Sequence, residues 1–326
     1  MKNDESKKSS RRRFLKDGLL FGTGALAVSP IIQSCAEEHT MPQDMVKVLT
    51  PDGKVLEVNR ANLKEVKGSQ LATTKEAIAG LPGRKFVMVI DLAKCKNARK
   101  CTEACQEGHD LAKDQEWMRI YLLQDGPQTA PYWFPRPCFH CDNPMCVSVC
   151  PVGATYKRTD GIVLVDTDRC IGCKFCMTGC PYSARVFNWK APEHQRLEEK
   201  DYSPELNVPA KEGTVGKCVF CADKLRNNEL PRCVTACPMG VIYFGNILED
   251  TITNGDETVR FSEIMKERSG YRYLETLGTV PSVFYLPPTN RMFPVERGLE
   301  NLDEENKSRY KDVEYVKSLN NVKKLK

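Results

Sequence analysis

Fifteen of the sixteen cysteines of this chain fall in four motifs, and this arrangement constrains the fold more than any hydrophobic pattern does. Within the motifs the cysteines recur at short fixed spacings, and three of the four motifs end in Cys-Pro. A tight loop that carries cysteines at such spacings can wrap an iron–sulfur cluster. We therefore expect metal sites to organise the chain, since an apolar content of 41% over 326 residues does not indicate one large aliphatic core.

The third motif, "CIGCKFCMTGCP", is the most specific of the four. It reproduces the bacterial ferredoxin run C-x2-C-x2-C-x3-C-P in full, and the second and fourth motifs are the same run with longer loops. In that run the last cysteine ligates the partner cluster, and the proline after it suits the first turn of a helix. The motif cysteines, in order, are Cys95, Cys101 and Cys105; Cys138, Cys141, Cys146 and Cys150; Cys170, Cys173, Cys176 and Cys180; and Cys218, Cys221, Cys233 and Cys237.

The first motif lacks one cysteine. Ala98 stands where the ferredoxin spacing requires the second cysteine, between Cys95 and Cys101. Because alanine has no donor atom, this site offers three thiolates. We expect a 3Fe-4S cluster here, with a cubane completed by a non-cysteine or water ligand, or an empty site, as the alternatives.

Other uses of these cysteines fit the spacing less well. A disulfide framework would not need repeated x2 and x3 spacings, and zinc ribbons use two C-x2-C pairs at longer separation. A Rieske site needs two histidines, and no second histidine accompanies His140 at suitable spacing. We expect His140 to pack or hydrogen-bond near a cluster. His109 is the better candidate for a substitute ligand at the first motif, although we expect it to be a surface or capping residue.

The first 35 residues resemble a bacterial twin-arginine export signal. Residues 10–16 match its S-R-R-x-F-L-K pattern, and the apolar run that follows is interrupted by Gly22, Gly24 and Pro30. A spanning helix needs about 20 apolar residues, so we do not expect a permanent transmembrane helix here. Because this route exports folded proteins, we expect the cysteines to leave the cytoplasm already occupied; a basic N-terminus before a short buried helix is the alternative.

Cys35 stands apart from the four motifs. It follows "IIQS", which is similar to a lipoprotein processing box, so we expect Cys35 to carry lipid and residues 36–44 to form a tether. Ordinary signal cleavage, with Cys35 left as a thiol, is the alternative. The resulting location is the periplasmic side of a bacterial membrane.

Charge and motif content argue against nucleic-acid binding and against a catalytic site in this chain. Residues 1–34 carry a net charge of +4 out of the chain's +5, so the remainder has no basic face for nucleic acid. No Ser-His-Asp set, Gly-rich phosphate loop or convincing carboxylate pair is present, so we expect no substrate site of its own.

From about residue 85 to residue 288 the chain resembles the four-cluster electron-transfer subunits of the dimethyl sulfoxide reductase superfamily of molybdopterin oxidoreductases, which includes polysulfide and tetrathionate reductases. The matching stretches are "RPCFHCDNPMCVSVCPVGATYKRTDGIVLVD", "RCIGCKFCMTGCPYSARVFNW", "GKCVFCADKL" and "PSVFYLPP". The spacing alone does not decide how the motifs pair, but this family nests them, second with third and first with fourth.

The resemblance implies four ligand sets and the cofactors that they hold. Three are sites for 4Fe-4S clusters, and the fourth is the three-thiolate site, for which we expect 3Fe-4S. The sets are Cys138, Cys141, Cys146 and Cys180; Cys150, Cys170, Cys173 and Cys176; Cys105, Cys218, Cys221 and Cys233; and Cys95, Cys101 and Cys237.

We therefore predict an α+β protein of two nested ferredoxin-like dicluster modules, with an N-terminal hairpin and a C-terminal extension. The expected divisions are the signal (1–35), the tether and hairpin region (36–84), the iron–sulfur domain (85–250) and a C-terminal extension that docks a partner and ends in a charged tail (251–326). Alternating apolar residues predict the hairpin at 46–60, a strand at 86–90 and a helix within 260–277.

The expected function is transfer of single electrons between a large, molybdopterin-type catalytic subunit and a membrane quinone-linked subunit or a cytochrome. A free-standing soluble polyferredoxin and an enzyme with an open catalytic iron are the alternatives. We expect the aromatic residues around the motifs to shield the clusters from water, and Lys174, Lys217 and Lys224 to offset their negative charge.

Overall fold

The computed structural model describes residues 45–49, 55–59, 72–126, 129–191, 202–208, 210–289 and 302–313. The predicted signal, Cys35 and the tether up to residue 44 lie outside these residues, as does the end of the charged tail from residue 314. Within the described part of the chain, no helix combines the length and apolar character needed to cross a membrane.

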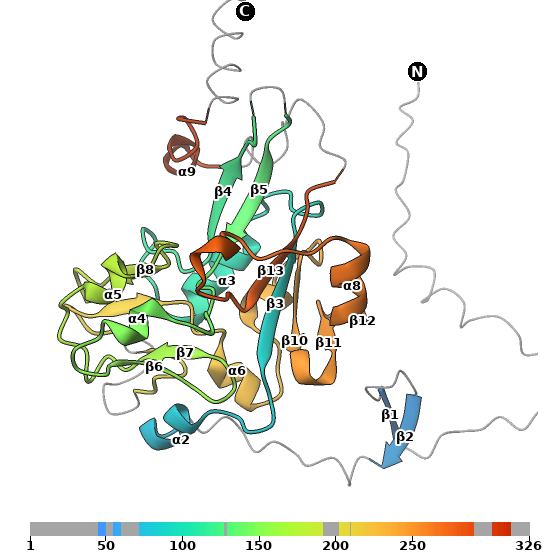
Figure 1. Ribbon diagram of the computed structural model, residues 1–326, viewed down its shortest axis with the longest axis horizontal. Coiled ribbons are helices and arrows are strands. Elements are labelled where there is room, and N and C mark those ends of the chain that lie inside the picture. Colours follow the sequence, from blue (N-terminus) through green and yellow to red (C-terminus); the bar gives the residue numbers. More distant parts are fainter. Residues whose placement is uncertain are drawn as a thin grey trace, which may run out of the picture.

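A five-stranded sheet forms one side of the molecule (Figure 1), in the order β12-β11-β10-β3-β13. Its centre is β3, whose sequence FVMVID is buried at every position and confirms the strand predicted there. This strand pairs antiparallel with β10 and parallel with β13, so it joins segments that are far apart in the sequence. The sheet strands are β3 (Phe86–Asp91), β10 (Ile242–Asn246), β11 (Thr251–Thr253), β12 (Thr258–Arg260) and β13 (Val283–Leu286).

The cysteine motifs lie on short helices and two-stranded hairpins beside this sheet (Figure 1). Such small elements bury little apolar surface by themselves, so what the loops between them enclose becomes important for stability. The hairpins are β4 (Arg119–Leu123) with β5 (Tyr132–Arg136), β6 (Thr155–Lys157) with β7 (Val163–Val165), and β8 (Arg185–Phe187) with β9 (Val215–Lys217). The helices are α3 (Lys100–Gly108), α4 (Met145–Ser148), α5 (Phe175–Thr178), α6 (Ala222–Arg226) and α7 (Arg232–Thr235).

Helix α3 packs against α7, which brings the first motif beside the fourth. In the same way α4 lies beside α5, so the second motif meets the third. A separate hairpin, β1 (Met45–Leu49) with β2 (Val55–Asn59), pairs antiparallel with Met45 opposite Asn59. Helix α2 (Thr74–Ala79) begins at a capping box in which Thr73 and Glu76 satisfy each other's backbone N–H groups.

The C-terminal extension belongs to the core more than the sequence indicates. The helix expected within 260–277 is only α8 (Phe261–Glu267), because Ser269 takes a left-handed conformation and Tyr271 then bridges to Tyr285 of β13. The stretch "PSVFYLPP" supplies β13, an edge strand of the five-stranded sheet that is buried at every position. Two short 3₁₀ turns, η4 (Ile247–Glu249) and η5 (Glu275–Leu277), complete this region.

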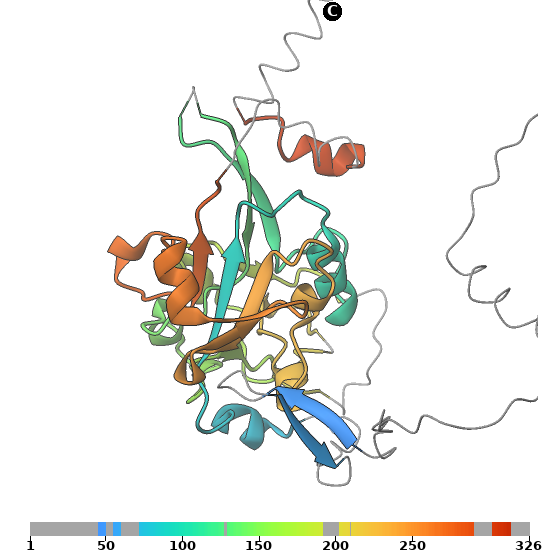
Figure 2. The ribbon, with the colours of Figure 1, turned by 90° about the vertical axis from the view of Figure 1, so that its right-hand side faces the viewer.

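Helix α9 (Glu304–Ser308) lies beside the hairpin of β4 and β5, which projects from the body of the molecule (Figure 2). Asp303 caps this helix by accepting a hydrogen bond from the backbone N–H of Asn306. Just after it, Tyr310 packs edge-on against Trp133 and donates a hydrogen bond to the carbonyl of Ile120. These contacts hold residues 302–313 on the hairpin.

Candidate metal centres

The structure gathers the fifteen described cysteines into four sets, all of them as free thiols. We name each set by one residue. Three sets line cavities. The fourth is assembled where α3, which carries Cys105, packs on α7, which carries Cys233, with His109 at the end of α3 reaching Cys221. The four sets are the Cys173 site (Cys150, Cys170, Cys173, Cys176), the Cys146 site (Cys138, Cys141, Cys146, Cys180), the Ala98 site (Cys95, Cys101, Cys237, with Ala98) and the Cys221 site (Cys105, Cys218, Cys221, Cys233).

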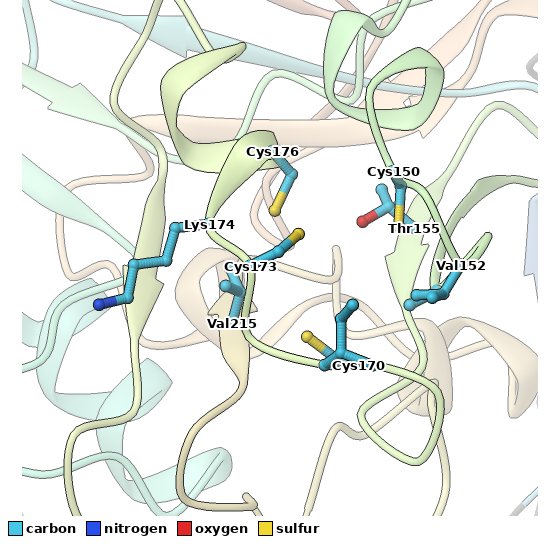
Figure 3. A pocket seen from close by; sticks show the side chains of 10 residues that line it. Cys150, Val152, Thr155, Cys170, Cys173, Lys174, Cys176 and Val215 are labelled. Atoms are coloured by element: carbon cyan, nitrogen blue, oxygen red, sulfur yellow. The ribbon is translucent and has the colours of Figure 1, made fainter.

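In the Cys173 site the four side chains face a common space (Figure 3), three from one loop and Cys150 from the opposite side. The loop turns sharply because Gly172 has a φ of 71° and Lys174 a φ of 63°. Only glycine fits at residue 172, since a Cβ there would lie 2.1 Å from the carbonyl oxygen of Gly213. Lys174 directs its amino group away from the sulfurs (Figure 3).

The Ala98 site keeps the turn of the Cys173 site without the cysteine. Asn97 and Arg99 have φ values of 55° and 56°, at the positions that correspond to Gly172 and Lys174. Helix α3 begins directly after Arg99, as α5 begins directly after Lys174. Ala98 therefore occupies the position of Cys173 in a loop of the same shape. The motif has lost one ligand and has kept its backbone conformation.

No substitute for the missing thiolate stands in the described wall of the Ala98 cavity. Besides the three cysteines, the lining side chains include no histidine, aspartate or glutamate, and the remaining polar or sulfur-bearing groups are Arg99, Lys100 and Met239. His109 lies elsewhere, and the expectation of a surface position for it is wrong. Its side chain is buried against Trp117, and its Nδ1 donates a hydrogen bond to the carbonyl of Leu206 at 2.7 Å.

The ring of His109 belongs instead beside the Cys221 site, where its Nε2 lies 3.6 Å from the sulfur of Cys221. Its backbone N–H does cap α3, by donating to the carbonyl of Cys105. His140 is buried as predicted: its Nδ1 accepts a hydrogen bond from the N–H of Val163 at 3.0 Å, and its ring stacks on Phe220 with centroids 3.7 Å apart.

Several thiols of the Ala98 and Cys221 sites are costly to ionise in the bare protein. Burial, followed by repulsion from neighbouring thiols, raises the pKa of Cys95 and of Cys101 to about 12. At the Cys221 site burial and then Cys221, Cys218 and Cys105 raise the pKa of Cys233 well above its usual value. A bound metal cation removes this cost, because cysteine ligates as the thiolate.

Cys150 differs, since its pKa is lowered. Burial by itself acts in the opposite direction, but backbone N–H groups of Thr155, Val152 and Ala154 donate to the sulfur and stabilise the thiolate. The exposed site thus holds a thiolate partly by its own backbone.

The four sets offer thiol sulfurs as their donor atoms. Among the residues that the structure describes, no three His, Cys, Asp or Glu side chains converge closely enough to hold one metal ion. A zinc ion binds thiolates at about 2.3 Å, so it would need the sulfurs drawn together around one point. Here they line the walls of cavities, with soft sulfur donors that are typical of iron–sulfur centres.

The four sites form a continuous series of neighbours. Cys101 and Cys105 lie one turn apart on α3, so the Ala98 site adjoins the Cys221 site. His140, which lines the Cys146 site, stacks on Phe220, which lies between Cys218 and Cys221, so the Cys221 site adjoins the Cys146 site. Helix α4, which carries Cys146, packs on α5, which carries Cys176, so the Cys146 site adjoins the Cys173 site. The order is therefore Ala98, Cys221, Cys146 and Cys173.

Most of the aromatic residues around the motifs shield this series, as expected from the sequence. Trp133, Phe134, Phe139, Tyr182 and Phe220 are all buried, and Phe139 packs on Tyr182 with centroids 4.4 Å apart. The exceptions surround the Cys173 site, where Cys173 itself is exposed. There Ile171, Phe175 and Trp189 are 64%, 59% and 68% exposed.

The three lysines named from the sequence have three different surroundings. Lys217 is buried and donates to the carbonyls of Val163 and Cys218. Lys174 lies over the ring of Trp189 at 3.7 Å, and Lys224 pairs with Glu229 at 2.6 Å.

Two arginines beside the thiols were not predicted from the sequence. Arg185 lines the cavity of the Cys146 site, and Arg232 lies at the Cys221 site, paired with Asp223. A charged residue that opens the short strand "RVF" was the available signal for Arg185.

Comparison with known proteins places the chain among iron–sulfur subunits. A family model described as a 4Fe-4S dicluster domain matches residues 129–198 and 205–247. The chain is 34% identical over 305 residues to the B subunit of selenate reductase from Mesobacillus selenatarsenatis, an alignment that covers 88% of this chain and 100% of that protein.

Two further relatives extend this likeness. The iron–sulfur cluster-binding subunit of menaquinone reductase from Nitratidesulfovibrio vulgaris is 38% identical over 233 residues, covering 62% of this chain and 88% of the relative. The B subunit of tetrathionate reductase from Salmonella typhimurium is 33% identical over 232 residues, covering 69% of this chain and 82% of the relative. Each of these alignments is long enough to include most of the relative.

Proposed function

The chain belongs to the iron–sulfur electron-transfer subunits of the molybdopterin oxidoreductases, and we propose that it relays single electrons between a catalytic subunit and a membrane quinone-linked subunit or a cytochrome. As a member of this family it is the electron-transfer component of an oxidoreductase complex and not the catalytic subunit. Its mixed α/β structure with a 4Fe-4S dicluster domain is of the kind that such subunits use.

The observation that carries the relay is the series of four adjoining cysteine sets. Iron–sulfur clusters, when bound, supply one-electron couples whose potentials span about −700 to +450 mV. The chain's own residues hold the four sets next to one another, surround the inner ones with buried aromatic rings and leave Cys173 and Ala98, at the two ends of the series, exposed. That arrangement gives electrons a protected route with accessible ends.

We assign the ligands as two nested modules. In one, the Cys146 and Cys173 sites each borrow a cysteine from the other's motif, Cys180 and Cys150 respectively. In the other, the Cys221 and Ala98 sites exchange Cys105 and Cys237 in the same way. The lining of the cavities and the packing of α4 on α5 and of α3 on α7 support this assignment.

Three of the sites would hold 4Fe-4S clusters, and the Ala98 site a 3Fe-4S cluster. Two observations favour 3Fe-4S there over an empty site or a cubane completed by another side chain of the described residues. The loop keeps the turn of the complete Cys173 loop, and the described lining offers no carboxylate or imidazole in place of the missing thiolate.

A quinone-linked partner is favoured by the relative named as a menaquinone reductase subunit. The exposed residues around Cys173 offer that partner, or the catalytic subunit, an apolar surface beside a cluster. The location follows from residues 1–35: export by the twin-arginine route and lipid attachment at Cys35 would place the complex at the periplasmic side of the membrane. Replacing Arg11 and Arg12 together by lysine should leave the protein in the cytoplasmic fraction; undiminished export would refute this location.

The relay is tested by anaerobic purification of the full chain from mildly solubilised membranes of the source cells. We expect the chain to co-purify with a molybdenum-containing subunit, and its clusters to be reduced by a menaquinol analogue or by the donor of that subunit. Recovery of the chain alone from the soluble fraction, with full clusters that neither donor reduces, would instead indicate a free polyferredoxin shuttle.

A further inference from the structure

Two buried cations face each other across the hairpin of β8 and β9. Arg185 is directly opposite Lys217 in the antiparallel register, and the residues are 3% and 1% exposed. Like charges directly opposite each other destabilise a pair of strands, and burial removes the water that would screen them. Something other than the hairpin must therefore compensate these charges.

Carboxylates of the described chain do not provide the compensation. Arg185 donates through Nη1 to the hydroxyl of Thr155 at 3.2 Å, and its buried Nη2 has no hydrogen-bond partner among the described residues. Lys217 donates only to backbone carbonyls. Arg158, the other buried arginine of the described residues, pairs with both Asp160 and Glu205. Arg158 thus shows that carboxylates pair with a buried arginine where no thiol site lies beside it.

The groups that do surround the pair are metal-ligand thiols. Arg185 lines the cavity of the Cys146 site, and its strand β8 contacts α5, the helix that carries Cys176 of the next site. Lys217 adjoins Cys218 of the Cys221 site in sequence and donates to its carbonyl. The two cations thus lie where three consecutive sites of the series meet. Four thiolates outweigh the positive charge of an iron–sulfur core, so an occupied site is anionic.

We propose that Arg185 and Lys217 form a built-in counter-charge for the inner clusters, which raises the reduction potentials of the Cys146, Cys173 and Cys221 sites together. This inference rests on the proposed function, because it requires those sites to hold clusters. The added electron makes each cluster more negative, so a nearby buried cation stabilises the reduced form more than the oxidised form. Because one pair is shared among three sites, it shifts their potentials in the same direction.

The test uses the full chain in its complex, with the variants Arg185→Gln and Lys217→Gln, and with Arg185→Lys to retain the charge. Each is followed by iron analysis and by a redox titration that records the electron paramagnetic resonance signal of every cluster. We expect Arg185→Gln to lower the potentials of the clusters at the Cys146 and Cys173 sites. At a fixed potential the ratio of oxidised to reduced cluster should rise about tenfold, which corresponds to a shift of 59 mV for a one-electron couple. Arg185→Lys should shift them much less.

Lys174→Gln is the matched control. Lys174 adjoins Cys173 in sequence, but its amino group points away from the sulfurs and lies over Trp189 (Figure 3), so removal of its charge should have a smaller effect. Potentials equal to wild type in Arg185→Gln and Lys217→Gln, with full iron, would overturn the inference and leave the proposed function intact. Absence of iron–sulfur signals from the wild-type chain would overturn both.

Failure of Arg185→Gln to assemble its clusters is also decisive. If Arg185→Lys then assembles them with near wild-type potentials, the charge is what the sites require, and the inference is supported. If Arg185→Lys fails as well, the side chain acts through its shape, and the counter-charge is refuted.

Discussion

The two ends of the series of sites are built on the same loop but differ in one residue and in their surroundings. At one end Cys170, Cys173 and Cys176 lie on a turn set by Gly172 and Lys174; at the other, Cys95, Ala98 and Cys101 lie on a turn with the same left-handed positions. This comparison indicates that the turn and the helix that follows it fix the backbone of the motif. The number of thiolates can therefore change without a change of fold.

The surroundings separate the two ends further. The Cys173 site has an exposed cysteine bordered by exposed Ile171, Phe175 and Trp189, whereas the Ala98 site is lined by Ile120 and Pro135 of the β4–β5 hairpin. Ala98 and Cys173 are both exposed, but the Cys173 end is bordered by large exposed apolar side chains, whereas the Ala98 end has the chain's own hairpin in its wall. We read the apolar border of Cys173 as a docking surface and the Ala98 end as a site whose ligand number has been altered.

The largest expected effect comes from restoring the missing ligand. In Ala98→Cys the new sulfur lies where Cys173 lies in the other loop, so we expect a 4Fe-4S cluster, one more iron per chain and loss of the 3Fe-4S signal. The reduction potential of that site should fall by at least about 59 mV, since a fourth thiolate adds negative charge. For a one-electron couple this is a tenfold change in the ratio of oxidised to reduced cluster. Iron analysis and electron paramagnetic resonance check this, and an unchanged 3Fe-4S signal would contradict the equivalence of the two loops.

The exposed apolar surface should matter for partner binding. Replacing Phe175 and Trp189 by serine should each cost about 2 kcal/mol of binding, or roughly a thirtyfold increase in the Kd for the partner, because large aromatic side chains dominate interfaces. Leu248→Ser is the matched control, since Leu248 is 65% exposed and lies on η4, away from the cysteine motifs. Equal Kd values for the aromatic variants and the wild type would remove the docking surface from the account.

The glycine of the complete loop should be more sensitive than other glycines with positive φ. Gly172→Ala combines a left-handed conformation, which costs an L-residue about 1–2 kcal/mol, with overlap of the new Cβ and the Gly213 carbonyl. Gly153→Ala, with a φ of 61° and open space around its Cβ, isolates the conformational cost alone. We expect loss of cluster absorbance at lower guanidinium concentration in Gly172→Ala than in Gly153→Ala. The same midpoint in both variants would show that the close approach is unimportant.

The smallest effect should come from Met239, the one thioether in the wall of the Ala98 cavity. Met239→Leu preserves volume and removes the sulfur, so the signal and potential of that site should stay as in the wild type. A changed signal would identify Met239 as the fourth ligand and replace the three-thiolate account.

The sequence predicted which residues carry the chemistry better than it predicted how they are arranged. The strand at Phe86–Asp91 followed from its apolar run, and the four motifs followed from their spacing, because both signals are local. The helix within 260–277 was predicted too long, since the pairing of Tyr271 with Tyr285 is a tertiary contact that overrides local periodicity. His109 was placed at the surface for the same reason, as its burial depends on Trp117 and Leu206.

The pairing of the motifs and the opposed cations show the limit of spacing more clearly. Spacing left open whether the first motif joins the second or the fourth, and only the family resemblance favoured nesting. The register that sets Arg185 opposite Lys217 joins strands on either side of a long connection, so nothing near either residue in the sequence indicates it. Left-handed residues at Asn97 and Arg99 were equally hidden, because neither is glycine.

The most direct test of the account is iron analysis combined with electron paramagnetic resonance of the anaerobically purified wild-type chain, oxidised and then reduced with dithionite. We predict about 15 irons per chain and the nearly isotropic signal of a 3Fe-4S centre in the oxidised sample, since three complete sites and one three-thiolate site are present. About 12 irons without that signal would show an empty Ala98 site and a series of three clusters. About 16 irons without it would show a fourth ligand, and either result would contradict the three-thiolate cluster.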